Sequence, residues 1–566
     1  MVPAWAGALA GLVSGGVALG IAQLAAGLVG PQTFPVVAVG DAAVDLTPAP
    51  LKDFAIRTVG ENDKAVLIGG VLVVLAAVAA LIGALARRRL AYGFAGLAAF
   101  GVIGLLAVLT RPDAGPLDAV PTVIGVAVGC WALSWLIRRA SGGRIPARVP
   151  DSAFAPDPAF APAATVAAPA ARPAAGDGRP EDEPDAEPGI KPDIGPDAER
   201  PAVMRAGDEL RAFDRRRLIT GAAGGVVVAG AAALLGRQFG GRQALDAARV
   251  GVALPKPATP AKPLPAGTDL RIRGLSPFVT PNSDFYRVDT ALVVPQVDPN
   301  DWSLRIHGLV DRPVELTYAD LLKMPLTEAD VTLTCVSNEV GGPYVGNARW
   351  LGVRMADVLR QAGLRSDADM LLSTSADGFT CGTPVDVVMD GRDALFAVAM
   401  NGEVLPVDHG FPVRQVVPGL YGYVSATKWV VDIKVTRFDA DEAYWTPRGW
   451  SEKGPIKTQS RIDLPAYGDS MKPGRTTIAG VAWAQHTGVD AVEVRVDRGE
   501  WRQAKLAAVP GPDTWRQWSI DWDATAGEHT LEVRATDAHG RTQTDRLAPP
   551  APDGATGWHA VTVRVG

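Results

Sequence analysis

The sequence predicts a multi-domain chain with an N-terminal α-helical transmembrane region, a mixed α+β domain and a C-terminal all-β sandwich. Three observations predict this order. Apolar residues are concentrated before residue 140, short strands and helices begin near residue 268, and alternating strands with tight turns follow residue 446. A chain of 566 residues is also too long for a single core.

Five apolar runs approach or exceed the length of about 20 residues that a bilayer-spanning helix needs. Four of them form a predicted four-helix transmembrane region over 1–140, and the fifth lies within 215–240 and is short and rich in Gly and Ala. The runs cover residues 5–29, 65–86, 90–109, 119–137 and 218–235.

The charges of the connecting loops predict the orientation of these spans. Arginine clusters at 87–89, 138–139 and 215–217 fall on one side of the membrane, whereas the acidic loop 30–64 falls on the other. Basic loops favour the cytoplasmic side. We therefore expect a multi-pass protein of the cytoplasmic membrane, with everything after about residue 240 on the extracytoplasmic side.

The fifth run has two interpretations. The residues 214–219 (Asp-Arg-Arg-Arg-Leu-Ile), followed by small apolar residues, are similar to a twin-arginine export signal placed inside the chain. The alternative is an ordinary transmembrane anchor whose arginines mark the cytoplasmic end.

Two segments have the composition of connectors. Residues 141–214 are rich in Pro, Ala and acidic residues, which predicts a disordered linker, and 241–267 reads as a stiffer spacer. No histidine precedes His307, which excludes bis-histidine haem in the helical region. We therefore expect the first four helices to anchor the chain or dock a partner. The alternative is that they form a binding pocket for a quinone.

The α+β domain is expected over 268–440. Residues 302–308 alternate as a strand, and 317–323 predict a short helix with Thr317 as its N-cap. A β-rich run over 331–335 ends on Cys335, and 354–362 predict a helix closed by Gly363.

The segment 446–566 is expected to be an all-β sandwich of the immunoglobulin type. Residues 492–496 alternate, 497–500 form a turn and 501–506 return, while 530–535 and 559–565 predict further strands. The segment contains no cysteine, so it lacks the inter-sheet disulfide of antibody domains.

Charge and cysteine content exclude two classes of protein. The net charge of −6 and the lack of a basic stripe argue against a nucleic-acid partner. Of the three cysteines, Cys130 lies in an apolar run, which leaves Cys335 and Cys381 in the rest of the chain. Two cysteines are too few for a disulfide framework, although a single disulfide between them is an alternative.

Cys335 and a group of cations are the residues that suggest chemistry. A thiol at the end of a buried strand can ligate a soft metal, remain a structural cysteine, or act as a nucleophile with His409 as its base. His409, Arg414 and Lys428 lie among Gly and Pro turns, where cations either hold a phosphate or form a solvated basic loop.

Four segments taken together resemble the sulfite oxidase family of molybdopterin-dependent oxidoreductases, in its membrane-anchored bacterial form. The cysteine segment Thr-Cys-Val-Ser-Asn-Glu, the run Asp-His-Gly-Phe-Pro-Val-Arg and the later Lys-Trp make the resemblance specific. The segments cover residues 278–289, 332–353, 375–379 and 401–429, and 446–566 resemble the C-terminal dimerisation domain of that family.

The resemblance implies a molybdenum–molybdopterin cofactor and a role for each matching residue. It makes Cys335 the protein ligand of molybdenum and the catalytic residue. The other implied cofactor contacts are Asn282, Tyr286 and Arg287 in the first segment, Ser375 in the third, and His409, Arg414, Ser425 and Lys428 in the fourth.

The departures from the family pattern bear on the substrate. Pro281, Val340 and Val398 stand where two arginines and a tyrosine are expected in true sulfite oxidases. Burying a dianion without cations is costly. We therefore expect oxygen-atom transfer on a neutral S- or N-oxide. A sulfite dehydrogenase-like enzyme and a cofactor-free docking or adhesion module are the alternatives. Cys381 is expected near the pocket or as a small buried residue.

The expected partners follow from what the chain lacks. It has no cysteine cluster for iron–sulfur and no cytochrome domain, so electrons must pass through a separate partner, such as a cytochrome or a quinone-linked membrane protein. The resemblance also implies a small-molecule substrate and a homodimer formed by the sandwich.

Overall fold

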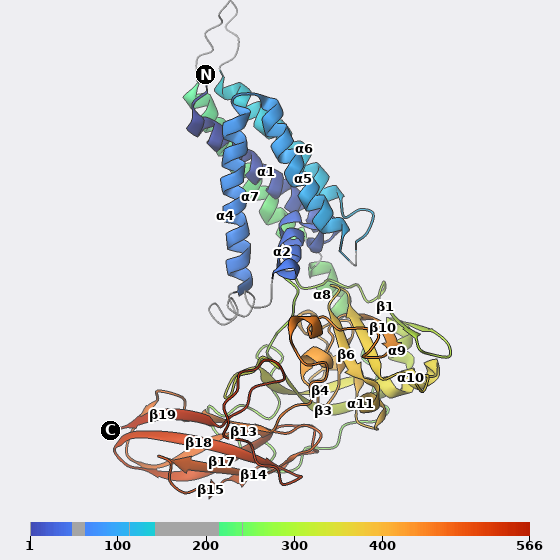
Figure 1. Ribbon diagram of the computed structural model, residues 1–566, viewed down its shortest axis with the longest axis vertical. Coiled ribbons are helices and arrows are strands. Elements are labelled where there is room, and N and C mark those ends of the chain that lie inside the picture. Colours follow the sequence, from blue (N-terminus) through green and yellow to red (C-terminus); the bar gives the residue numbers. More distant parts are fainter. Residues whose placement is uncertain (1, 48–62, 112–113, 142–213, 240–241) are drawn as a thin grey trace, which may run out of the picture.

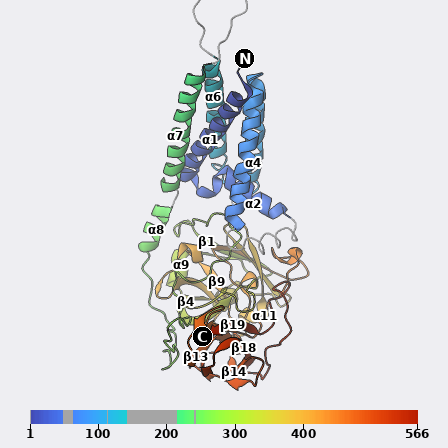
Figure 2. The same ribbon diagram turned by 90° about the vertical axis from the view of Figure 1, so that its left-hand side faces the viewer.

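The computed structural model contains a bundle of long helices joined to a sheet-rich body (Figure 1), and a view from the side shows the same two parts stacked along one axis (Figure 2). The structure describes residues 2–47, 63–111, 114–141, 214–239 and 242–566. The linker predicted over 141–214 lies outside the described residues except at its two ends.

Helix α1 (Ala4–Val29) lies at the centre of the bundle, where it contacts α4, α6 and α7. Small residues allow these helices to approach closely. A Cβ on Gly83 of α4 would lie 2.2 Å from the carbonyl oxygen of Gly7 on α1. The other helices of the bundle are α2 (Pro35–Leu46), α4 (Asp63–Ala86), α5 (Leu90–Leu109), α6 (Val120–Ala140) and α7 (Arg215–Phe239).

Each of the five apolar runs predicted from the sequence forms a helix that is long and apolar enough to cross a membrane. The bounds differ from the prediction by a few residues. These helices expose large apolar side chains, such as Val73 and Leu106, at 70% and 60%. Apolar exposure on this scale is typical of a surface that meets lipid.

Three of the α-helices that the structure describes were not predicted, one of them the short α11 (Val385–Met389). Helix α2 forms inside the predicted outer loop, and α8 (Arg242–Val250) forms inside the predicted spacer. Helix α8 packs against the sheet-rich body: Leu245 is buried in its core, and the guanidinium of Arg249 donates to the carbonyl oxygens of Val404 and Leu405 at 2.8 and 3.0 Å. The spacer is therefore partly an attached helix.

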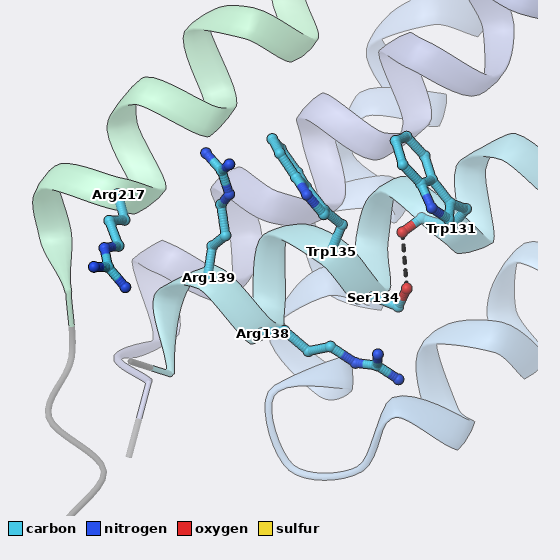
Figure 3. A pocket seen from close by; sticks show the side chains of 6 residues that line it. All are labelled: Trp131, Ser134, Trp135, Arg138, Arg139 and Arg217. Atoms are coloured by element: carbon cyan, nitrogen blue, oxygen red, sulfur yellow. Dashed lines mark hydrogen bonds between the residues drawn. The ribbon is translucent and has the colours of Figure 1, made fainter. Parts of the chain in front are cut away.

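The three arginine clusters lie at the end of the bundle that points away from the sheets (Figure 1). The Arg87 guanidinium lies 3.5 Å from the carbonyl oxygen of Val2, and the Asp214 amide donates to the carbonyl oxygen of Ala140 at 3.1 Å. A hollow at this end combines cations with indole rings (Figure 3). It is lined by Trp131, Ser134, Trp135, Arg138, Arg139 and Arg217.

The α+β part is built on two sheets, with orders β3-β4-β7-β8, to which β9 adds on β7, and β2-β1-β10-β5-β6. Neighbouring strands are antiparallel except β1 and β10. The strands are β1 (Ser303–Gly308), β2 (Val314–Thr317), β3 (Leu326–Thr334), β4 (Val345–Arg354), β5 (Met370–Ser375), β6 (Thr380–Pro384), β7 (Leu395–Met400), β8 (Glu403–Val404), β9 (Arg414–Val416) and β10 (Val430–Thr436).

Local signals in this part are confirmed. Helix α9 (Tyr318–Lys323) begins with a capping box between Thr317 and Asp320, and α10 (Met355–Ala362) ends at Gly363 in the left-handed region with φ of 73°. Short α11 (Val385–Met389) follows β6. The β-rich run predicted to end on the cysteine is the last part of β3, and Cys335 follows it directly.

The C-terminal part consists of two further sheets, with orders β11-β13-β17-β16 and β12-β19-β18-β14-β15, whose inner faces share one apolar core. The segment predicted to return as one strand over 501–506 splits: β15 pairs with β14, and β16 pairs with β17 in the other sheet. The strands are β11 (Gln459–Leu464), β12 (Ser470–Met471), β13 (Gly474–Trp483), β14 (Val489–Val496), β15 (Arg502–Gln503), β16 (Lys505–Leu506), β17 (Arg516–Ala524), β18 (Gly527–Asp537) and β19 (His559–Val565).

Candidate functional site

Cys335 lies in a short loop that its own backbone closes between β3 and β4. Its amide donates to the carbonyl oxygen of Tyr344 at 3.0 Å, and its carbonyl oxygen accepts from the Asn338 amide at 3.1 Å. The Asn338 side chain accepts from the Tyr344 amide at 2.8 Å. The thiol is buried, and burial raises its pKa although hydrogen bonds from Ser337 oppose the shift. Without a bound cation this cysteine is a protonated thiol.

The C-terminal part supports this strand from behind. The Trp515 amide donates to the Thr332 hydroxyl at 2.7 Å, and the Gln485 side chain donates to the Thr334 hydroxyl at 2.8 Å. Gly341, three residues after Asn338, has a φ of 78° and lies so close to His559 that a Cβ would meet the imidazole at 2.1 Å. The position of Cys335 is thus fixed by both sheet-rich parts.

The first of the four segments reaches the fourth through Asn282. The Asn282 carbonyl oxygen lies 2.9 Å from Nε2 of His409, and its side-chain oxygen accepts from the Asn401 amide group at 2.8 Å. Phe285 packs edge-on against His409, with ring centroids 5.6 Å apart. Residues far apart in the sequence therefore meet beside the core of the β3–β4–β7 sheet.

Arg414 is a buried cation. Its side chain donates to the carbonyl oxygen of His409 at 3.1 Å and lies 5.0 Å above the ring of Trp350. Burial lowers the pKa of the guanidinium to about 10, so it stays charged at neutral pH. No carboxylate pairs with it in the part of the chain that the structure describes, and a buried cation without a counter-ion is costly.

Gly410 makes the close packing of these cations possible. Its φ of 111° lies in the region that only glycine adopts without strain. A Cβ at this position would lie 3.0 Å from Cβ of Arg414 and 3.1 Å from Cβ of Lys428. The turn Asp-His-Gly therefore sets the distance between the two basic side chains.

Lys428 is paired with a carboxylate that the sequence did not single out. Its Nζ donates to Asp289 at 2.7 Å, and the Arg287 guanidinium donates to the same carboxylate at 3.0 Å. Burial, partly offset by Asp289, lowers the pKa of Lys428 to about 8. Asp289 is the last residue of the first segment and was not among the predicted contacts.

His409 is held neutral. Burial lowers its pKa to about 4, and the nearby cations Arg414 and Lys428 act in the same direction. The loss of hydration is the largest cause, although the carbonyl oxygen of Asn282 opposes it. An anion placed beside Arg414 and Lys428 would oppose this lowering of the His409 pKa.

The remaining predicted contacts border the same region. Ser375 ends β5 and hydrogen-bonds to Asp377. The Ser425 hydroxyl is buried and donates to the Tyr421 carbonyl oxygen at 2.9 Å. Cys381 is a free buried thiol on β6, and because Cys335 is also free, the structure contains no bridge between them.

Three tyrosines lie near Cys335, and two of them, Tyr344 and Tyr421, were not predicted from the sequence. The charge of a Cys335 thiolate would raise the pKa of both Tyr286 and Tyr421, which places the two phenols in its electrostatic surroundings. Tyr344 is a third, with its ring 6.3 Å from that of Tyr286. Tyr286 was predicted as a pterin contact, whereas Tyr421, in the turn Pro418–Gly422, was not.

The side chains at this site suit a metal whose other ligands come from a bound cofactor. Within the described residues, no three His, Cys, Asp or Glu side chains gather as a metal site. A single thiolate is a weak metal site by itself. A soft metal at Cys335, chelated by an anionic cofactor whose charge meets Arg414 and Lys428, suits this combination of one sulfur and several buried cations.

Comparison with known proteins also indicates a molybdopterin-binding oxidoreductase. Residues 291–445 match the family described as an oxidoreductase molybdopterin binding domain. Mitochondrial sulfite oxidase of Mus musculus is 32% identical over 342 residues, which cover 51% of this chain and 62% of the mouse protein. The uncharacterized oxidoreductase YuiH of Bacillus subtilis (strain 168) is 34% identical over 157 residues, which cover 28% of this chain and 76% of that protein.

Among solved structures, the sulfane dehydrogenase SoxCD from Paracoccus pantotrophus aligns with a TM-score of 0.44 at 24% identity, over 52% of this chain and 84% of that chain. The chain spans 62% of the length of the mouse enzyme.

Proposed function

Because the chain belongs to the family of oxidoreductases with a molybdopterin-binding domain, we propose that it is a membrane-anchored enzyme that transfers an oxygen atom at a molybdenum held by Cys335. The observation that carries the proposal is the buried, unpaired charge of Arg414 beside His409 and Lys428. A folded protein retains such a charge at a cost, and an anionic cofactor offsets that cost when it binds.

Each predicted contact has a task in this proposal. Arg414 and Lys428 supply charged donors for the cofactor phosphate, and His409 gains a proton when that anion arrives. Asn282 and Ser375 orient the polar ring system, while Arg287, Tyr286 and Ser425 close the site. When bound, the molybdenum–pterin group supplies the two-electron redox chemistry and accepts or donates the oxygen atom.

The surroundings of Cys335 favour a neutral substrate. Ser337, Tyr286 and Tyr421 near Cys335 donate hydrogen bonds without charge. Pro281 and Val340 stand in place of arginines. Val398 supports this less than expected from the sequence, because it is fully buried in the core with Phe396 rather than with Trp350. We therefore infer a sulfoxide or N-oxide as substrate.

The helical region is proposed to cross the cytoplasmic membrane five times, with the catalytic part outside. All three arginine clusters lie at one end of the bundle and the sheets at the other (Figure 1). Arg139 lies 4.1 Å above Trp135 in the hollow at the basic end (Figure 3). Basic and indole side chains gather where a membrane meets the cytoplasm. Helix α7 serves here as a fifth span or as a twin-arginine signal anchor.

We propose the division of the chain that the sequence predicts. It places a transmembrane region over 1–140, an anchor over 215–240, a catalytic domain over 268–440 and a dimerisation domain over 446–566. The two packed sheets of the last segment support an immunoglobulin-like sandwich. Homodimer formation through it can be measured by light scattering of the purified chain.

Steady-state assays with an artificial electron donor or acceptor test the substrate. The wild-type protein is expected to reduce methionine sulfoxide or a tertiary amine oxide, and Cys335→Ser is expected to lose that activity. Efficient sulfite oxidation with no oxide reduction would replace the proposal by a sulfite dehydrogenase. No redox activity with either class, in protein that contains molybdenum, would contradict both.

A further inference from the structure

A hollow between the helical bundle and the catalytic part is built by residues of both. Its volume is about 150 Å³, a size that accommodates one six-membered ring. The bundle contributes Asp41 of α2, Ala107 of α5 and Arg111 just after α5, and the catalytic part contributes Asp377, Phe379 and Tyr444. It is separate from the basic hollow at the opposite end of the bundle.

The side of this hollow that the catalytic part forms lies next to the predicted cofactor contacts. Asp377 is hydrogen-bonded to Ser375, and its carboxylate interacts electrostatically with Asp289, the partner of Lys428 at 2.7 Å. A molecule in the hollow would lie one side chain away from Ser375. This position suits a molecule that exchanges electrons with a cofactor at that site.

The side of the hollow that the helical bundle forms lies next to the apolar surface of α5. Ile103, Ala107 and Thr110 recur at helical spacing and share one face. Ala107 and Thr110 line the hollow, and Ile103 is 50% exposed. An apolar chain attached to a ring in the hollow would follow this face toward the part of the bundle proposed to meet lipid.

The charges of the hollow select against anions. Asp41 and Arg111 are hydrogen-bonded at 2.9 Å, so the cation is already neutralised, and Asp377 adds a second carboxylate. With Arg111 paired to Asp41, the carboxylate of Asp377 leaves the hollow with a net negative charge, which repels a phosphate headgroup or sulfite. Carboxylates also accept hydrogen bonds from the hydroxyl groups of a neutral ring. Phe379 and Tyr444, with ring centroids 5.6 Å apart, supply an aromatic wall.

We propose that this hollow binds the ring of a membrane quinol, which reduces the enzyme directly. The inference rests on the proposed function. The quinol gives up two electrons and two protons and becomes the quinone. The sulfoxide loses its oxygen atom, which leaves as water with those two protons, so the products are sulfide, quinone and water. This replaces a haem-bearing partner, which the histidine-free helical region does not supply.

Binding and turnover can be measured separately on the full-length, molybdenum-loaded protein in nanodiscs. Ala107→Phe fills the hollow with a phenyl ring. Ala98→Phe is the matched control, since Ala98 is exposed on the opposite face of the same helix. The probe is a short-chain azidoquinone, used for equilibrium binding and for photolabelling followed by peptide mapping.

The wild type and Ala98→Phe are expected to bind the probe and to carry label on α5 or on residues 377–379. Ala107→Phe is expected to bind it at least about tenfold more weakly, which is a loss of about 1.4 kcal/mol. It should also lose turnover with quinol while it keeps turnover with a viologen donor and its molybdenum content.

Label elsewhere, or equal binding by Ala107→Phe and the wild type, would overturn the inference. Lack of viologen-driven turnover in the wild type, together with specific labelling of the hollow, would instead contradict the proposed function and leave the quinone site standing.

Discussion

One buried arginine of the catalytic part differs in its partners from two arginines of the C-terminal part. In the catalytic part, Arg414 is buried and donates only to backbone carbonyl oxygens among the described residues. In the C-terminal part, Arg495 and Arg534 each pair across strands β14 and β18 with Glu532 and Glu493, at 2.7 and 2.8 Å. Satisfied arginines stabilise a sheet, whereas a buried unsatisfied one indicates a ligand.

His409 of the catalytic part and His529 of the C-terminal part also differ in their surroundings. Burial among cations lowers the pKa of His409 to about 4, while a hydrogen bond to Asp497 raises the pKa of His529. His409 lies beside Arg414, which no carboxylate pairs with among the described residues, whereas His529 is hydrogen-bonded to the carboxylate of Asp497. Opposite responses to mutation and to pH follow from this difference.

The largest effect is expected for Asp289→Asn in the cofactor-free protein. Asp289 and Lys428 are both largely buried, with side chains 4% and 10% exposed. Removing one partner of a buried pair costs about 3 kcal/mol of unfolding free energy. Urea unfolding measures it, with Asp408→Asn as control, because the 47% exposed Asp408 pairs only loosely with Arg287. Equal effects of the two variants would show that the catalytic pair behaves like a surface pair.

Arg414→Met should separate ligand binding from stability. The loss of a charged donor to the cofactor phosphate is expected to weaken cofactor retention about 10- to 100-fold. The cofactor-free protein should keep or gain stability, because an unpaired buried charge is replaced by an apolar side chain of similar length. Pterin fluorescence after denaturation measures retention. A variant that is unstable without cofactor and retains it normally would reverse the interpretation of Arg414.

The pH dependence should have opposite signs in the two parts. Since His409 titrates near pH 4 when folded and near 6.5 when unfolded, its contribution to stability is lost as the pH falls through this range. His529 titrates above 6.5 when folded, so its contribution is lost as the pH rises above that value. His409→Gln and His529→Gln should each flatten one slope in urea midpoints of the cofactor-free protein. Slopes of the same sign would contradict the contrast.

A smaller effect is expected for Arg534→Met. Arg534 lies 4.3 Å from the ring of Trp501 and pairs with Glu493 on a partly exposed surface. Cross-strand and cation–π contacts of this kind contribute about 1 kcal/mol. Thermal unfolding should show that loss, and cofactor content should stay unchanged. A drop in cofactor content would mean that the C-terminal sheets take part in binding.

Short-range signals in the sequence predicted the five long apolar helices, helices α9 and α10, and many strands correctly. The capping box at Thr317, the left-handed Gly363 and the β-rich run before Cys335 depend on neighbours in the chain and were all confirmed. Helix α8 was missed because its stability comes from contacts with Val404 and Leu405, which lie more than 150 residues away.

The candidate site was predictable as a set of segments and not as an arrangement. The order of motifs placed Cys335, His409, Arg414 and Lys428 in one family pattern. Asp289 and Tyr421 were missed because their importance arises only when the first and fourth segments meet around Lys428 and Cys335. The sequence predicted a changed pocket from Val398, but its side chain is buried in the apolar core.

The central claim is that Cys335 and Arg414 belong to one molybdenum–pterin site, and joint measurement of molybdenum and pterin in the same purified samples tests it most directly. We expect near-stoichiometric amounts of both in the wild type, both strongly reduced in Arg414→Met, and pterin retained with disturbed metal spectra in Cys335→Ser. Wild-type protein from a cofactor-competent host that contains neither molybdenum nor pterin would contradict the account.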